Sequence, residues 1–137
     1  MRSHFGLILF AEIAAFGIWA PRLGFYHDDW VFLEKCLRVG NWWAAAGEFA
    51  EGGYWSRPLE ILHFPLLYAW GGLKPLPYQL VLLGLDAAQA MLFFVLLRRL
   101  LDAPRLALLS ACLFVLHPSR FATHVWMAGS PQALALA

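Results

Sequence analysis

The sequence predicts an all-α protein, a polytopic bundle of transmembrane helices with about three spanning helices and a partial fourth. Of its 137 residues, 61% are hydrophobic and 14% are charged, whereas soluble domains carry about 45–50% and about 25%. Nine of the 19 charged residues lie in segment 22–58 and four more lie in 98–105, which leaves long apolar stretches elsewhere. We therefore expect one transmembrane domain over 1–137, with short interfacial helices in a first outer loop at 22–58.

The same composition excludes several classes of protein. A 137-residue soluble enzyme could not bury this apolar share, and two cysteines do not make a disulfide scaffold. Ten basic residues against nine acidic ones leave no excess charge for binding nucleic acid.

The first apolar run, 5–20, has 16 residues, slightly fewer than the roughly 17–25 of a spanning helix. Arg2 and Arg22 flank it and can extend their charged ends toward the lipid headgroups. A signal peptide is the alternative, because a basic start precedes an apolar stretch. The residues Ile18-Trp19-Ala20 do not form a small-x-small cleavage site, so we predict an uncleaved anchor.

The second half of the chain holds one clear span. Segment 76–97 contains a single charge, Asp86, and ends at two arginines. Segment 59–73 is interrupted by Pro65 and two glycines, which favours an interfacial or re-entrant segment. Segment 106–116 is short and crosses only if it is tilted or if its polar ends lie among the headgroups.

The last apolar stretch, 121–137, stops without a cap, a turn or a polar tail, so we expect a truncated end of a larger protein. Basic residues of short connections favour the cytoplasmic side. This rule places Arg2 and segment 98–105 inside, and it places loop 22–58 and the corner 117–120 outside.

An acidic pair, Asp28 and Asp29, follows directly on the first helix. Either residue could cap a short amphipathic helix over 30–38, with Trp30, Leu33 and Leu37 on its apolar face, or both could simply be solvated. In the functional alternative, one carboxylate is a general base at the edge of a low-dielectric region.

A metal site at the acidic pair would need His27, Asp28 and Asp29 together. Three neighbours in sequence rarely converge on one ion, so no metal is assigned. Arg57 stands at the end of the same loop. It either anchors the chain at the membrane surface or binds a phosphate through its guanidinium.

Four residues with a carboxyl or carboxamide side chain lie within the runs 5–20 and 76–97: Glu12, Gln79, Asp86 and Gln89. The last three fall on one narrow face of a helix. Intramembrane carboxylates are costly and face the protein interior, so we expect them to join helices. A small transporter subunit that uses Glu12 and Asp86 as carriers is a third functional alternative.

The order of the motifs resembles the N-terminal third of the GT-C membrane glycosyltransferases, in the protein O-mannosyltransferase-like branch with its bacterial relatives. The motifs are, in chain order, Phe25-Tyr26-His27-Asp28-Asp29-Trp30, Ser56-Arg57-Pro58-Leu59, Gly71-Gly72-Leu73, Pro75-Leu76-Pro77-Tyr78-Gln79-Leu80, Leu97-Arg98-Arg99-Leu100, and Leu116-His117-Pro118 leading to Val125-Trp126-Met127-Ala128-Gly129. The resemblance extends over nearly the whole chain.

The resemblance implies an inverting transferase that takes a sugar from a polyprenyl-phosphate donor and passes it to an acceptor hydroxyl. By position, Asp28 resembles the family's base, Asp29 its supporting neighbour and Arg57 a residue that holds the donor phosphate. The implied setting is a bacterial inner membrane with loop 22–58 on the outer side, and membrane lipid as a partner. The sugar and the acceptor are not specified, and no cofactor is assigned.

At the second outer corner the chain departs from the family. The family has an acidic residue, an arginine and another acidic residue where this sequence has Ala122, Ser130 and Gln132. The family also needs more membrane crossings than this chain supplies, so we expect it to be inactive as a 137-residue chain. The alternative is a small non-catalytic multi-pass protein, either an assembly subunit or the remnant of a gene.

Overall fold

The fold was determined as a computed structural model that describes residues 2–52, 58–120 and 127, and no strand is present among them. The elements, in order, are α1 (Arg2–Glu12), the π-helical turn η1 (Ile13–Gly17), the 3-10 turn η2 (Ala20–Arg22), α2 (Asp28–Val39), α3 (Trp42–Glu51), α4 (Pro58–Gly71), α5 (Pro75–Leu101), α6 (Pro104–Leu116) and the 3-10 turn η4 (Pro118–Arg120). This confirms the predicted all-α class.

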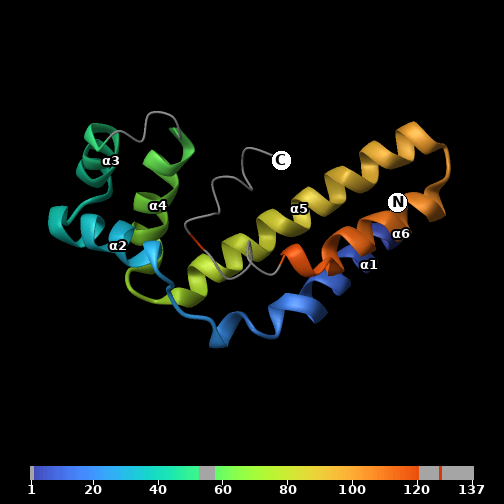
Figure 1. Ribbon diagram of the computed structural model, residues 1–137, viewed down its shortest axis with the longest axis horizontal. Helices are drawn as coiled ribbons and strands as arrows, with labels where there is room; N and C mark the ends of the chain where they lie inside the picture. The colour runs from blue at the N-terminus through green and yellow to red at the C-terminus, as the bar shows by residue number, and fades with distance from the viewer. Residues whose placement is uncertain (1, 53–57, 121–126, 128–137) are drawn as a thin grey trace.

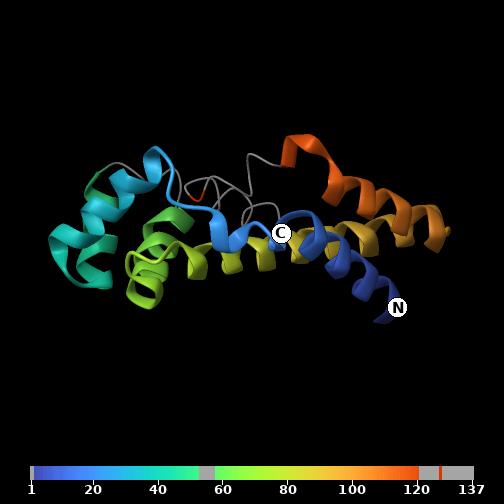
Figure 2. The ribbon, with the colours of Figure 1, turned by 90° about the horizontal axis from the view of Figure 1, so that it is seen from below.

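The long helix α5 runs through the elongated molecule and organises it (Figure 1). Helices α2, α3 and α4 gather around its Pro75 end. Helices α1 and α6 lie beside its Leu101 half, as the second view confirms (Figure 2). Helix α1 packs against both α5 and α6, so these three helices form one group, and α2–α4 form a second group at the other end of α5.

Among the residues that the structure describes, two helices are long and apolar enough to cross a membrane. They are the helical run Ser3–Arg22, of 20 residues, and α5, of 27 residues. At about 1.5 Å per residue α5 is about 40 Å long, more than the roughly 30 Å of a hydrocarbon core. Helix α6 is a shorter apolar helix of 13 residues, and the partial fourth span predicted at 121–137 lies outside the described residues apart from Met127.

The exposed side chains of α5 and α6 are suited to contact with lipid. Large apolar residues are exposed at helical spacing on both helices: Leu92, Leu96 and Leu100 on α5, and Leu106, Leu109, Leu113 and Leu116 on α6. Water would penalise such apolar stripes, whereas lipid tails solvate them.

The predicted first span is not one continuous α-helix. Helix α1 ends at Glu12 and continues as the π-helical turn, where the Ile18 amide donates to the Ile13 carbonyl at 3.2 Å. Pro21 then lies inside the 3-10 turn η2, and the chain becomes extended at Leu23. Proline lacks an amide donor and its ring crowds the preceding turn, which disfavours a regular α-helix here.

Among the described residues, two apolar cores hold these helices together. The first joins α2, α3, α4 and the start of α5, and contains Phe32, Leu33, Cys36, Ala45, Ala46, Phe49, Ile61, Phe64, Leu67, Tyr78, Leu82 and also Met127. The second joins α1, α5 and α6 through Ile8, Ala90, Phe94, Ala107, Ala111 and Val115. Its three alanines let α5 and α6 approach closely, which is how membrane helices gain van der Waals contact.

The junction of α4 and α5 is tightly packed at Gly71. A Cβ atom at this position would lie 3.0 Å from both Pro77 Cβ and Tyr78 Cε2. Tyr78 is fully buried, and its hydroxyl donates to the Gly72 carbonyl at 2.8 Å, so the ring cannot easily move away.

Gly71→Ala should therefore destabilise the protein by about 1–3 kcal/mol, the usual cost of overpacking. Gly47→Ala on α3 is the matched control, because nothing lies within 4 Å of its Cβ position. The control should raise stability by about 0.5–1 kcal/mol through helix propensity. Thermal unfolding in detergent measures both, and equal melting temperatures would contradict the tight packing.

Candidate functional site

The acidic pair lies at the start of α2, where the chain turns after the first membrane helix. The Asp29 amide donates to the Tyr26 carbonyl at 2.8 Å, and the Trp30 amide donates to the His27 carbonyl at 3.3 Å. These bonds form the first turn of α2. Both aspartates lie inside that turn, where a carboxylate interacts favourably with the positive end of the helix dipole.

The predicted capping role is wrong for both aspartates, because the N-cap position is held by His27 and has no side-chain cap bond. The Asp29 side chain instead contacts the backbone three residues before it. Its Oδ2 accepts a hydrogen bond of 2.8 Å from the Tyr26 amide, and its side chain is fully buried. The buried Asp29 carboxylate therefore stabilises the turn through its hydrogen bond to the Tyr26 backbone.

Asp28 has the opposite environment, since its side chain is exposed. The preceding residue, His27, has φ 40° and ψ −102°, a backbone conformation that L-residues rarely adopt. Such strain costs of order 1–3 kcal/mol and persists only where the surroundings impose it. The turn thus holds one carboxylate buried and presents its neighbour to solvent.

A cluster of three aromatic rings, Phe25, Trp30 and Tyr78, packs around this turn. The Phe25 ring meets the Tyr78 ring edge to face at 5.2 Å and the Trp30 ring at 5.4 Å. Edge-to-face pairs add about 0.5–1.5 kcal/mol beyond their buried area. Because Tyr78 belongs to α5 and is bonded to Gly72, the acidic turn is tied to the Pro75 end of the long helix.

The short helix predicted at 30–38 is confirmed as α2, but its predicted apolar face is partly wrong. Leu33 is buried in the core, whereas Trp30 is 54% exposed and Leu37 is 49% exposed. The face that packs inward carries Asp29, Phe32, Leu33 and Cys36. Burial raises the pKa of the Cys36 thiol to about 11, in keeping with an apolar surrounding.

The remaining predicted site residue, Arg57, lies outside the described residues, as do Ala122, Ser130 and Gln132 of the second corner. Within the described part of the chain, no three His, Cys, Asp or Glu side chains are placed to hold a metal ion.

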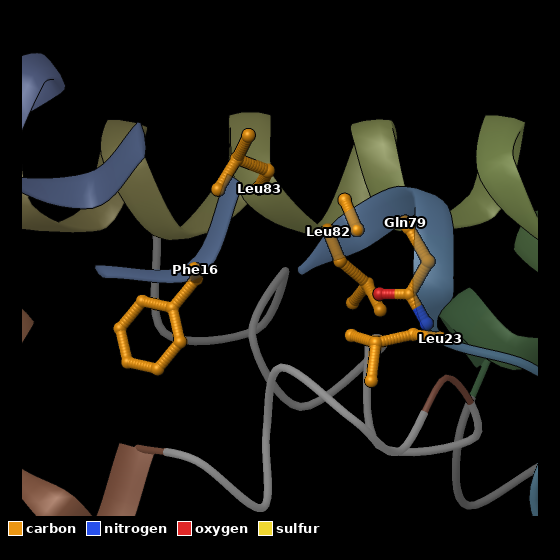
Figure 3. A pocket seen from close by; sticks show the side chains of 6 residues that line it. Phe16, Leu23, Gln79, Leu82 and Leu83 are labelled. Atoms are coloured by element: carbon orange, nitrogen blue, oxygen red, sulfur yellow. The ribbon is translucent and has the colours of Figure 1, made fainter. Parts of the chain in front are cut away.

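A small cavity of about 10 Å³ lies between the segment that ends the first helical run and the first half of α5 (Figure 3). Phe16, Leu23, Leu82 and Leu83 line it, and the amide of Gln79 points toward Leu23. The Gln79 amide nitrogen is buried and has no hydrogen-bond partner among the described residues.

A second set of polar side chains lies between α5 and the corner that follows α6. The sequence predicted only part of this set. Arg120 Nη2 donates to Asp86 Oδ1 at 2.6 Å and to Gln89 Oε1 at 3.0 Å. The prediction that Asp86 joins helices is thus supported by a named partner. The sequence contained an indication of this partner. An aspartate within a membrane requires a cation, and Arg120 is the last charged residue of the chain.

The corner 117–120 lies beside the middle of α5. Arg120 meets Asp86, about 16 Å along α5 from its start. Helix α6 has 13 residues and spans about 20 Å, so it returns only to the middle of the 27-residue α5.

Comparison with known proteins gives one partial similarity. The protein O-mannosyl-transferase Tmtc1 of Drosophila melanogaster is 36% identical to this chain over 87 residues. The match covers 64% of the chain and 10% of the relative, so the chain spans about a tenth of that relative's length. No protein-family profile matches the chain, and no solved structure matches it. With the two helices long enough to cross a membrane, the similarity supports a glycosyltransferase-like membrane protein.

The two aspartates should respond differently to truncation. Asp29→Ala removes the carboxylate that accepts from the Tyr26 amide, and a hydrogen bond to a charged group contributes about 1.5–3 kcal/mol. Asp28→Ala, the matched control, should cost only about 0.3–1 kcal/mol through the lost interaction with the helix dipole, because the side chain is exposed. Thermal unfolding and hydrogen exchange at the Tyr26 amide measure the effect, and similar losses in both variants would contradict the assignment.

Proposed function

We propose that this chain is the N-terminal part of an integral-membrane glycosyltransferase that transfers a sugar from a polyprenyl-phosphate donor to an acceptor hydroxyl on the outer face. The observation that carries the proposal is the acidic turn, in which Asp28 is exposed and Asp29 is buried. The similarity to an O-mannosyl-transferase supports the same class of reaction. Because the chain spans a tenth of that relative, the activity is proposed for the full-length parent.

The roles follow from exposure and charge. A hydroxyl is a poor nucleophile, so the acceptor needs a base, and Asp28 is the carboxylate that solvent and substrate can reach. Asp29 positions the turn through the Tyr26 amide. Arg57, at the end of the same loop, would compensate the charge of the departing lipid phosphate through its planar guanidinium.

The decisive experiment measures sugar transfer from a polyprenyl-phosphate donor by the reconstituted full-length parent. Asp28→Asn keeps the size of the side chain but removes the proton acceptor. Turnover should fall by about 10²–10⁴-fold while donor binding changes little. Glu51→Gln, an exposed carboxylate on α3, is the matched control and should keep full turnover.

Arg57→Ala should additionally weaken donor binding, because the phosphate loses a charge-assisted hydrogen bond. Near-wild-type turnover in Asp28→Asn would overturn the catalytic assignment. If the wild-type parent transferred no sugar either, the alternative of a non-catalytic multi-pass protein would be favoured.

The proposal requires loop 22–58 to face the outer side and the α5–α6 turn to face the cytoplasm. In a background without Cys36 and Cys112, Glu48→Cys on α3 should react with a membrane-impermeant thiol reagent in intact cells. Ala103→Cys, between α5 and α6, should react only after the membrane is permeabilised. The reverse pattern of labelling would invert the topology and exclude an outer acidic turn.

A further inference from the structure

The small cavity between the segment that ends the first helical run and the first half of α5 contains one polar side chain (Figure 3). Gln79 is 3% exposed, and its amide nitrogen Nε2 has no hydrogen-bond partner among the described residues. Gln89, farther along α5, is also buried, but its Oε1 accepts a hydrogen bond of 3.0 Å from Arg120. The two buried glutamines of α5 therefore differ, because one is bonded within the protein and the other is not.

A buried amide without a partner destabilises a protein. Its desolvation is not offset by a hydrogen bond, so the great majority of such groups in folded proteins are paired. Methionine has nearly the same length as glutamine and fills the same space without this penalty. A buried donor that the described part of the chain leaves unpaired is suited to a ligand that accepts its hydrogen bond.

The rest of the cavity is apolar. Four apolar side chains of the first helical run, the segment after it and α5 line it: Phe16, Leu23, Leu82 and Leu83. The cavity is partly open and has a volume of about 10 Å³, on the scale of a single oxygen atom. A ligand would therefore place one oxygen atom beside Gln79 and apolar groups beside the leucines, as an amphipathic molecule does.

The depth of Gln79 in the membrane favours a lipid phosphate as this ligand. Gln79 lies four residues after Pro75, about 6 Å along α5. Because α5 is about 10 Å longer than the hydrocarbon core, a helix centred in the bilayer places Gln79 near the level of the headgroup phosphates. A lipid can reach a cavity between two helices that are long enough to cross a membrane. A water-soluble acceptor instead reaches the exposed side of the acidic turn.

Positive charge is present at the same end of both helices. Arg22 lies in η2, which packs against α5, and Lys74 directly precedes α5. Both side chains are exposed. Two cations and the Gln79 amide are thus available to an anion at this level, and hydrogen bonds to a charged group are stronger than bonds between neutral groups.

The first turns of α5 connect this cavity to the acidic turn. Tyr78, the residue before Gln79, packs its ring against Phe25 at 5.2 Å. Leu23, two residues before Phe25, lines the cavity. The segment 23–26 therefore runs along α5 from the cavity to the acidic turn, and a lipid bound beside Gln79 would lie next to this segment.

We propose that Gln79 is a substrate-binding residue, whose Nε2 donates a hydrogen bond to a phosphate oxygen of a polyprenyl-phosphate lipid. The apolar side chains of the cavity contact the isoprene unit next to the phosphate. This role rests on the proposed function and adds a residue of α5 to the part of the protein that holds the donor. It requires no contact between Gln79 and the sugar.

Gln79→Met removes the amide and keeps the length of the side chain. Because the variant no longer buries an unpaired donor, its melting temperature should rise by about 2–8 °C in a detergent without phosphate. Gln89→Met is the matched control, since it makes the same change at a glutamine that is bonded to Arg120, and it should lower the melting temperature.

Binding of polyprenyl phosphate without a sugar tests the ligand, and it is measured by calorimetry on the full-length parent in the same detergent. Gln79→Met should weaken this binding by about 10- to 100-fold, the effect of losing a hydrogen bond to a charged group. Gln89→Met should bind as the wild type does at a temperature where both are folded. Phosphatidylglycerol, the other source of a lipid phosphate, should not displace the polyprenyl phosphate.

Three results would overturn the role of Gln79 alone. A lower melting temperature of Gln79→Met would show that the amide is bonded within the protein. Unchanged binding by a stabilised Gln79→Met would show that the amide does not contact the phosphate, and displacement by phosphatidylglycerol would assign the cavity to ordinary lipid. A wild-type parent that binds no polyprenyl phosphate would overturn the proposed function together with the role of Gln79.

Discussion

The ion pair between Asp86 and Arg120 is the interaction on which the arrangement of the membrane helices depends. Both partners are held in an apolar layer, where removing either one would leave a buried charge. The pair joins the middle of α5 to the corner that follows α6, and α1 packs against both helices. The small residues of the α5–α6 interface then permit close packing, but they do not by themselves select which turns of the two helices meet.

The Pro75 end of α5 is organised by a different set of contacts. Tyr78 is bonded to Gly72 and packed against Phe25, which connects the α4–α5 junction to the acidic turn. The turn can then hold His27 in a strained conformation and keep Asp29 buried beside an exposed Asp28. Strain of this kind is sustained only by surrounding structure, so the aromatic cluster and the acidic turn form one unit.

Much of the secondary structure could be predicted, because it depends on local patterns. The apolar run of α5 and the signals that begin α2 near Asp29 are properties of neighbouring residues, and both helices are present. The inward face of α2 was predicted only in part, because which side is buried depends on where α3 and α4 pack. The π-helical turn after Glu12 was not predicted, because no local residue pattern distinguishes it from a continuous helix.

The sequence by itself determined the class of protein. Its apolar share, its clustered charges and its interrupted hydrophobic runs predict helices that are apolar enough to cross a membrane, because charged side chains are costly in the hydrocarbon core. Only the tertiary structure decided the partners and environments of the charged residues. Asp28 and Asp29 are chemically identical neighbours, and only their position on α2 makes one exposed and the other buried. In the same way Arg120 meets Asp86, 34 residues away in sequence, because the length of α6 sets where the chain returns along α5.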